Sequence, residues 1–482
     1  MSISNLFDRD ASSIAAGNGY FSDYGPRWKY LLESYVGGEA YRDGGHLQRY
    51  QLESPTEYQS RLNTAHLDNH CASVVSVYNS FLFRQPPERD LANLDSQPYT
   101  QNFLRDADRD GTSFDNFMKD VATFSSVFGH SWVIVSKPDV GALTMADEIS
   151  ADARPYVNLL TPLNVLDWIY QRNSVGAYRL SYFKYVEEYN GDTRIIKEWT
   201  PEEIITTVVE DSEEKTVVLE VDVEVNGLGY IPAVIAYNKK TSVRGIGASD
   251  IADIADVQKF IYNMQNELEQ TIRLGSHPSL VVTPEVIAGN GAGSLIQIPE
   301  SMDPGLRPYL LEYNGSSASS IMDAIAGAVS SIDKMANIGS IRSTESRRMS
   351  GVAQQQEFEL LNARLSEKAD NLELAEEQIW KIFADYQGQV YAGTVTYPDS
   401  FNIRDIDGEY AQLKMAADTA SDPIVRRVID GKILELLGED DDMLYEFEPH
   451  IMTDPESGDS VIAQTREQHL ELSAQGYLHN SE

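Results

Sequence analysis

The amino-acid sequence predicts a mixed α+β fold, with helices and antiparallel strands in separate stretches of the chain. Residues 155–237 are rich in β-branched and aromatic residues and are interrupted by turn signals. Two other stretches, 250–274 and 352–387, contain neither Gly nor Pro and repeat apolar residues at helical spacing. Of the 482 residues, 42% are apolar and 23% are charged, as is typical of a folded globular protein.

The chain is strongly acidic, because 75 Asp and Glu face 38 Lys and Arg, a formal net charge of -37. Gripping nucleic acid by its phosphates needs clustered cations, so this balance argues against tight nucleic-acid binding as the main task. The single cysteine, Cys71, excludes an internal disulfide and a cysteine-built metal centre. We see no signal peptide and no run of 18 apolar residues, so we expect no membrane-spanning helix and no membrane partner.

Helix signals come first along the chain. A Ser-Pro-Thr-Glu capping box at residues 54–57 predicts a helix that runs to about Phe83. Apolar residues at helical spacing predict a second helix from about Ser113 to Gly129, followed by a strand over 131–135.

The strand-rich stretch is typical of an antiparallel meander, because Asn-Gly turn signals separate its apolar runs. The expected strands cover residues 156–160, 178–185, 194–199, 204–209, 216–221 and 231–237.

A narrow apolar seam marks the stretch 250–274, which Ser249 can cap as a helix. The seam follows a 3-4-3-4 spacing and consists of Ile254, Val257, Ile261, Met264 and Leu268. Two short strands are expected next, over 279–283 and 294–298. They flank a glycine-rich loop, a hairpin tip, that contains Gly289, Asn290, Gly291 and Gly293.

A second helix is expected over 317–338, built largely of small residues and isoleucines. A polar break, 339–351, then carries the three cations Arg342, Arg347 and Arg348. The next helix, 352–387, would span roughly 54 Å. A strand over 394–397, helices over 407–419 and 422–437, and a polar tail complete the expected elements.

Motifs for catalysis or cofactor binding are weak or missing. The sequence has no phosphate-binding P-loop and no G-x-S-x-G motif. Residues 106–111 imitate the start of a calcium loop, but position twelve is Phe117 where a Glu is needed, which favours an ordinary loop. His66 and His70, four apart on the expected helix, lack the Glu of a metalloprotease motif and are expected at the surface. We therefore expect no enzyme activity, no cofactor and no metal site.

The order of these elements resembles the portal protein of tailed bacteriophages. The resemblance covers about residues 26–437 and rests on arrangement more than on any signature residue. Its segments are 28–31, 54–58, 83–87, 110–117, 129–135 and 227–234, followed by two helices around a strand-bearing insert, a polar loop and one very long helix.

The resemblance implies a fold with named parts. These are a wing (1–247), a first stem helix (248–274), a clip (275–316), a second stem helix (317–338), a tunnel loop (339–351), a long wing helix (352–390) and a crown with a tail (391–482). It also implies a homo-oligomeric ring of twelve copies at one capsid vertex, assembled in the host cytoplasm and kept in the virion. The ring would serve as the channel for packaging and ejecting double-stranded DNA.

Partners also follow from the resemblance: the major capsid or scaffolding protein, the large terminase subunit that drives packaging, and a head–tail adaptor that docks on the clip loop. DNA would pass through without tight binding, since an acidic wall repels phosphates over the 8–10 Å or so that salt allows. Arg342, Arg347 and Arg348 are expected near the narrowest point of the channel. The seam of the first stem helix, and the small residues Ala318, Ala324, Ala326, Gly327 and Ala328 of the second, would let neighbouring helices pack closely.

Two alternatives remain at this stage. One is another phage head–tail assembly protein, such as an adaptor or a minor head protein, although these are usually shorter and lack the long helix. The other is an acidic enzyme from a high-salt organism, which would need a pocket with convergent titratable groups.

Overall fold

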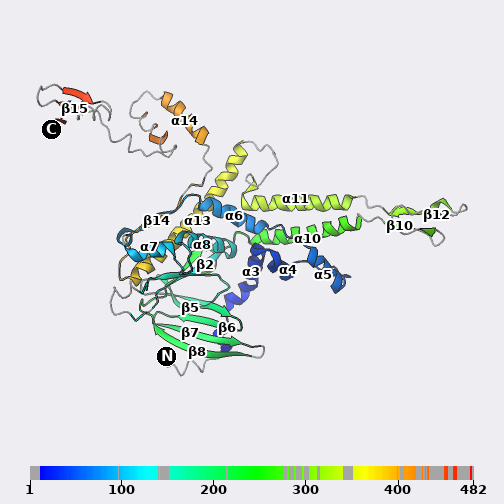
Figure 1. Cartoon of the computed structure of the whole chain (residues 1–482), viewed down its shortest axis with the longest axis horizontal. Helices are drawn as coiled ribbons and strands as arrows, with labels where there is room; N and C mark the ends of the chain where they lie inside the picture. The colour runs from blue at the N-terminus through cyan, green and yellow to red at the C-terminus, as the bar shows by residue number, and fades with distance from the viewer. Residues whose placement is uncertain are drawn as a thin grey trace. The chain divides into compact units, whose positions relative to one another are not determined.

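A computed structural model gives the fold of the chain (Figure 1). The structure describes residues 11–95, 97–138, 140–141, 151–212, 215–275, 279–281, 287–288, 296–297, 303–311, 315–339, 351–398, 400–401, 406–419, 426, 429, 431–433, 450–453, 460–463 and 478–479. Contacts divide the chain into unit 1, residues 1–401, and unit 2, residues 402–482. Helices and strands both contribute, so the α+β class is confirmed.

The N-terminal part of unit 1 is helical, with α2 (Ala11–Ala15), α3 (Gly19–Val36), α4 (Gly38–Asp43), α5 (Pro55–Thr64) and α6 (His70–Leu82). The expected capping box is confirmed, since Ser54 and Glu57 exchange side-chain and backbone hydrogen bonds. A single helix to Phe83 is wrong. The chain leaves the helix at Ala65, which is extended, and Asn69 then caps α6 by accepting the Ala72 N–H at 2.9 Å.

A three-stranded antiparallel sheet lies at the centre of unit 1, in the order β3 (Tyr156–Leu160), β2 (His130–Ser136), β9 (Ala233–Tyr237). Every residue of β2 is buried. Helix α8 (Phe114–Phe128) packs on this strand and ends at Gly129, as expected. Gly129 adopts the left-handed conformation. Short elements β1 (Glu88–Asp90), η1 (Ala92–Leu94) and α7 (Pro98–Arg105) precede α8.

The second sheet is a five-stranded meander of β4 (Val165–Arg172), β5 (Tyr178–Asn190), β6 (Thr193–Trp199), β7 (Glu203–Asp211) and β8 (Thr216–Val225). The meander is thus confirmed for its middle strands, but β3 and β9 belong to the other sheet, where both pair with β2. The sequence analysis also missed β4 and β1. Strand β8 forms an edge of the meander, and Glu220, Asp222 and Glu224 alternate along it as exposed residues.

Helices α10 (Ala252–Gly275) and α11 (Ser316–Ala336) lie side by side and run antiparallel (Figure 1). The insert between them holds β10 (Ser279–Val281), β11 (Ile287–Ala288), β12 (Ile296–Gln297), η2 (Pro304–Leu306) and β13 (Tyr309–Leu311). The two expected strands, now β10 and β12, do not pair with each other. Strand β10 pairs with β13 at the helix ends, and β11 pairs with β12 around the glycine-rich loop.

Helix α13 (Gly351–Tyr386) has the expected length. Its stripe is buried at Leu361, Leu365, Leu372, Ile379 and Ile382, in the same core as α6, α8 and β2. Strand β14 (Thr394–Thr396) follows and pairs with β1. Among the described helices, none is long and apolar enough to cross a membrane.

Unit 2 contains α14 (Ile406–Thr419), as expected, and a small antiparallel sheet in the order β16 (Ser460–Ala463), β15 (His450–Thr453), β17 (Leu478–His479). The sheet was not anticipated in the polar tail. The helix expected over 422–437 falls largely outside the described residues, although 426, 429 and 431–433 are helical.

Candidate functional site

The two halves of the apolar seam of α10 differ in how deeply they are buried. Ile254 and Ile261 are buried in the core of unit 1, and Val257 packs against that core. Met264 and Leu268, nearer the insert, are half-buried. The first half of the seam therefore packs inside its own chain, and contact between copies through the seam stays a prediction.

Buried polar side chains hold α10 to the N-terminal helices. The side chain of Gln258 accepts the Cys71 N–H at 2.8 Å and donates to the carbonyl oxygen of Ser34 at 2.9 Å. Arg61 donates to the side chain of Asn266 at 2.6 Å, and both residues are buried. Gln258 replaces its lost water with protein partners on both its oxygen and its nitrogen, and Asn266 does so on its oxygen, which fixes the rotation of α10 about its axis.

At the root of the helix pair, a buried group that we call the junction cluster joins α10 to α13. It consists of Ser126, Asn238, Asp250, Arg364 and Lys368. The Lys368 ammonium donates to Asp250, to Asn238 and, at 2.7 Å, to the hydroxyl of Ser126. Arg364 donates to the second oxygen of Asp250 at 3.0 Å. All three donors of the ammonium are satisfied, as burial of a charge requires.

The electrostatics of the junction cluster favour the ion pair. Burial alone would raise the pKa of Asp250, but Lys368 and Arg364 outweigh it and hold that pKa below its ordinary value. Burial lowers the pKa of Lys368, and the carboxylate of Asp250 opposes that change. We conclude that Asp250 is ionised and acts as the acceptor for both cations.

The C-terminal end of α11 is tied to the same place. Arg364 donates to the carbonyl oxygen of Met335 at 3.1 Å, and the Tyr78 hydroxyl donates to that of Ala336 at 2.8 Å. These bonds satisfy carbonyl groups that a helix end leaves without partners. Arg364 therefore bridges the start of α10, the end of α11 and the middle of α13.

Two glycines allow the chain before α10 to approach the end of α8. The backbones of Gly129 and Gly247 face each other, and a Cβ atom on either would clash with the carbonyl group of the other. The Gly247 N–H donates to Nδ1 of His130 at 3.3 Å. Burial lowers the pKa of His130 to about 3, so its ring is a neutral acceptor. This close approach places the N–H of Asp250 3.0 Å from the carbonyl oxygen of Ser126.

The loop residues proposed from the sequence lie outside the described residues. These are Arg342, Arg347 and Arg348 of the tunnel loop and Gly289, Asn290, Gly291 and Gly293 of the clip loop. The base of the tunnel loop is described. Ile338 is buried, and the Gly339 N–H donates to the Glu357 carboxylate of α13 at 2.8 Å. The start of this loop is therefore fastened to the helix that follows it.

Sequence reasoning missed the junction cluster. Arg364 and Lys368 are four residues apart on a helix, a pattern that is typical of a solvated helix face. Asp250 is likewise ordinary at the start of a helix. No periodicity reveals that these charges face one another, because the cluster forms only when segments far apart in sequence meet.

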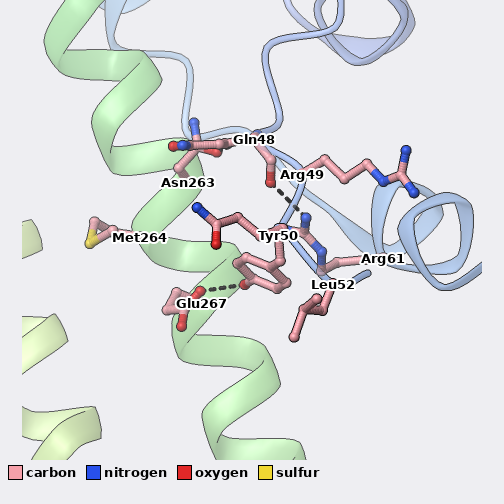
Figure 2. Close-up of a pocket in the computed structure, with 9 residues that line it drawn as sticks. Gln48, Arg49, Tyr50, Leu52, Arg61, Asn263, Met264 and Glu267 are labelled. Carbon is pink, nitrogen blue, oxygen red and sulfur yellow. Dashed lines mark hydrogen bonds between the residues drawn. The ribbon is translucent and has the colours of Figure 1, made fainter. Parts of the chain in front are cut away.

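A cavity of about 540 Å³ separates α10 from the turn before α5 (Figure 2). Its lining residues are Gln48, Arg49, Tyr50, Gln51, Leu52, Arg61, Asn263, Met264 and Glu267. The Tyr50 hydroxyl donates to Glu267, and the Arg61 guanidinium lies 4.0 Å from the centre of the Tyr50 ring. Tyr50 thus contacts two other ionisable side chains of the lining, Glu267 and Arg61.

The structure describes both of the weak metal motifs. In the calcium-like loop, Asp106 and Asp108 accept backbone N–H groups of the loop itself, such as that of Gly111 at 3.0 Å. His66 is exposed between α5 and α6, whereas His70 is buried at the start of α6, so the expectation of two surface histidines on one helix is wrong. Among the described residues, no group of His, Cys, Asp or Glu is arranged to hold a metal ion.

Comparison with known protein families finds that this chain matches one family model. A family model described as "Phage portal protein, SPP1 Gp6-like" matches residues 47–413. No curated protein matches the chain. Similar solved structures include a chain from the neck of an empty GTA particle computed with C6 symmetry. It is 11% identical, with a TM-score of 0.44, and covers 82% of this chain and 99% of that one.

Two further structures are similar. A chain from the neck of the native GTA particle computed with C12 symmetry is 10% identical, with a TM-score of 0.42. A chain from the virion of a native gene transfer agent particle is 10% identical, with a TM-score of 0.38. Each covers 83% of this chain and 98% of the other.

Lys368→Met tests the junction cluster. We expect it to lower the free energy of unfolding by about 3–5 kcal/mol, because it leaves the Asp250 carboxylate buried without its main partner. Lys381→Met is the matched control on the same helix, since Lys381 is exposed and pairs with Glu377 at the surface, and should change stability by less than about 0.5 kcal/mol. Urea unfolding measures both, and equal losses would contradict the role of the cluster.

The pH dependence of the same variants supplies a second measurement. Because the pKa of Asp250 is depressed in the folded state, its stabilising effect is present above the unfolded pKa. It is lost as the pH falls through the folded pKa, in the acid range below about pH 4. The stability difference between wild type and Lys368→Met should therefore shrink on acidification. A constant difference would mean that Asp250 is not the titrating partner.

Proposed function

The chain belongs to the SPP1 Gp6-like family of phage portal proteins, and from this membership we propose that it is one subunit of a ring-shaped DNA channel. The ring would sit at one vertex of the capsid, in the virion, and carry double-stranded DNA in during packaging and out during ejection. The observation that carries the proposal is the extent of the family match, which spans the paired helices, their insert and α13. The family is one of structural proteins.

The finer details are proposed on the same basis. We expect twelve copies in the ring and assembly in the host cytoplasm with the capsid or scaffolding protein. The large terminase subunit would supply the energy for packaging, in keeping with the absence of a P-loop sequence in this chain. A head–tail adaptor would bind the outer end of the channel, where the insert between α10 and α11 projects.

The net charge of -37 suits a channel through which a polyanion slides. Each Lys or Arg that contacts a phosphate releases counterions and tightens binding, so a wall rich in cations would hold the DNA. An acidic wall repels it at short range instead. The three arginines of the tunnel loop would offer transient phosphate contacts, or pair with acidic residues of the neighbouring copy.

The position of the tunnel loop supports this assignment. The chain enters it from α11, whose end is bound by Arg364 and Tyr78, and leaves it into α13. The hydrogen bond from Gly339 to Glu357 joins the start of this loop to α13.

Electron microscopy of the purified full-length chain tests the proposal most directly. We expect ring-shaped particles with a central hole. A monodisperse monomer of 53.8 kDa at concentrations well above those used for imaging would contradict it.

Replacing Arg342, Arg347 and Arg348 together by Ala should reduce DNA packaging severalfold, because the loop loses its contacts to phosphate or to the next copy. The measurement is the amount of nuclease-protected DNA in assembled heads. The control replaces three exposed arginines of the meander region, Arg172, Arg179 and Arg244, which removes the same charge elsewhere. Packaging at the wild-type level in the loop variant would refute the role of these cations.

Deleting residues 288–293 should abolish binding of the head–tail adaptor while leaving the ring intact, since the strands next to the helix ends, β10 and β13, are kept. Co-sedimentation of assembled rings with adaptor measures the first effect and electron microscopy the second. Undiminished adaptor binding by a ring that lacks this hairpin tip would rule out the docking role.

A further inference from the structure

The turn formed by residues 49–53 presents an apolar side chain to solvent on a rigid support. Leu52 is 99% exposed. Arg49 donates twice to the carbonyl oxygen of Glu53, at 3.1 and 2.6 Å, and the Tyr50 N–H donates to the Glu53 carboxylate at 3.1 Å. Arg61 binds the same carboxylate with two nitrogens, at 2.7 and 2.8 Å. The turn therefore needs no ordering before it binds a partner, which lowers the entropic cost of association.

The turn and α11 lie on opposite sides of α10. The turn faces α10 across the cavity described above, and α11 packs along α10. Both views agree on this order, with α10 between α11 and the segment that precedes α5 (Figures 1 and 2). Copies placed side by side in the same orientation would therefore bring the turn of one toward α11 of the next.

The outward face of α11 offers a shallow surface for Leu52. Ala324, Ala326 and Gly327 are exposed, and a Cβ atom added to Gly327 would meet nothing in its own chain. Glycine weakens a helix, so contacts within the chain give no reason for it here. Gly327 and Met264, a residue that lines the cavity behind the turn, are equally far along their helices from the ends that carry the insert. The turn and this face therefore lie at about the same height on the helix pair.

Charge and hydrophobicity are complementary across the two surfaces. Arg49 is exposed on the same turn as Leu52, and its guanidinium donates to the carbonyl oxygen of Glu53. Asp323 is exposed one helical turn from Gly327 and makes no ion pair or hydrogen bond with the described residues. Met322, which is 57% exposed, adds an apolar neighbour. In a chain with twice as many acidic as basic residues, one cation at the tip of the turn lowers the repulsion between copies where they approach.

We infer that the turn 49–53 of one copy docks on the outward face of α11 of the next copy, with Leu52 against Ala326 and Gly327 and Arg49 toward Asp323. The contact is heterologous, meaning that two different surfaces meet, and such contacts form a ring when the rotation from copy to copy closes. This inference rests on the proposed ring and names the surfaces that join its subunits.

Disulfide crosslinking of the full-length chain tests the contact. The double variant Leu52→Cys with Gly327→Cys should, on mild oxidation, give a ladder of covalent multimers that ends at the size of the ring. Cys71, the only native cysteine, is fully buried, and burial raises the pKa of its thiol to about 12, so it stays unreactive. The control is Val225→Cys with Gly327→Cys, because Val225 is also highly exposed, at 84%, but lies on β8. It should give no ladder.

The variant Leu52→Asp tests the same contact without a crosslinking reaction. Association should weaken about tenfold or more, seen as a shift of the assembly midpoint in sedimentation velocity, because an apolar contact is replaced by a charge. Val225→Asp should assemble like wild type, and both variants should keep the wild-type unfolding curve. Wild-type rings without a ladder, or normal assembly of Leu52→Asp, would overturn the contact and leave the ring standing. A wild-type chain that forms no ring would overturn both.

Discussion

The buried charge of Lys368 constrains the rest of the structure. An ammonium group out of water needs three acceptors, and here they come from α8, from the segment after β9 and from the residue that leads into α10. Because α13 supplies the ammonium, the cluster holds α8, the segment between β9 and α10, and α13 together. Arg364, one turn away, adds the end of α11. The junction cluster thus fixes the place where α10 and α11 leave the core, and it sets the direction in which both helices and their insert extend.

A helix that projects from a core usually depends on apolar packing along its length. In α10, only the half of the apolar seam nearer the junction cluster packs in the core. Hydrogen bonds between α10 and the N-terminal helices hold the rest of the helix in place. Gln258 and Asn266 each need partners in fixed positions, whereas an apolar contact tolerates sliding. Polar fastening therefore sets the register of the helix, and it leaves α11 and the turn 49–53 with outer faces that their own chain does not cover.

Local signals allowed much of the fold to be predicted. The capping box at Ser54, the helix end at Gly129 and the uninterrupted stretch of α13 each depend on neighbours within a few residues, and each is confirmed. Which strands pair with one another could not be predicted from the sequence. The runs that became β3 and β9 look like the meander strands, yet both pair with β2. The break at Ala65 was not predicted because the residues around it are compatible with a helix. Lys368 is buried, but its sequence neighbours alone are typical of a surface residue.

The edge strand β8 has a consequence for a protein that works in many copies. A strand of ten residues that pairs with β7 on one side only offers the backbone groups of its other side to the same strand of any molecule nearby. Crowding during assembly would make such stacking fast, and it would lead to aggregates instead of closed particles. The alternating carboxylates of Glu220, Asp222 and Glu224 place like charges opposite one another when two such strands pair with these residues in register. Part of the acidity of this chain therefore acts as protection against self-association through the wrong surface.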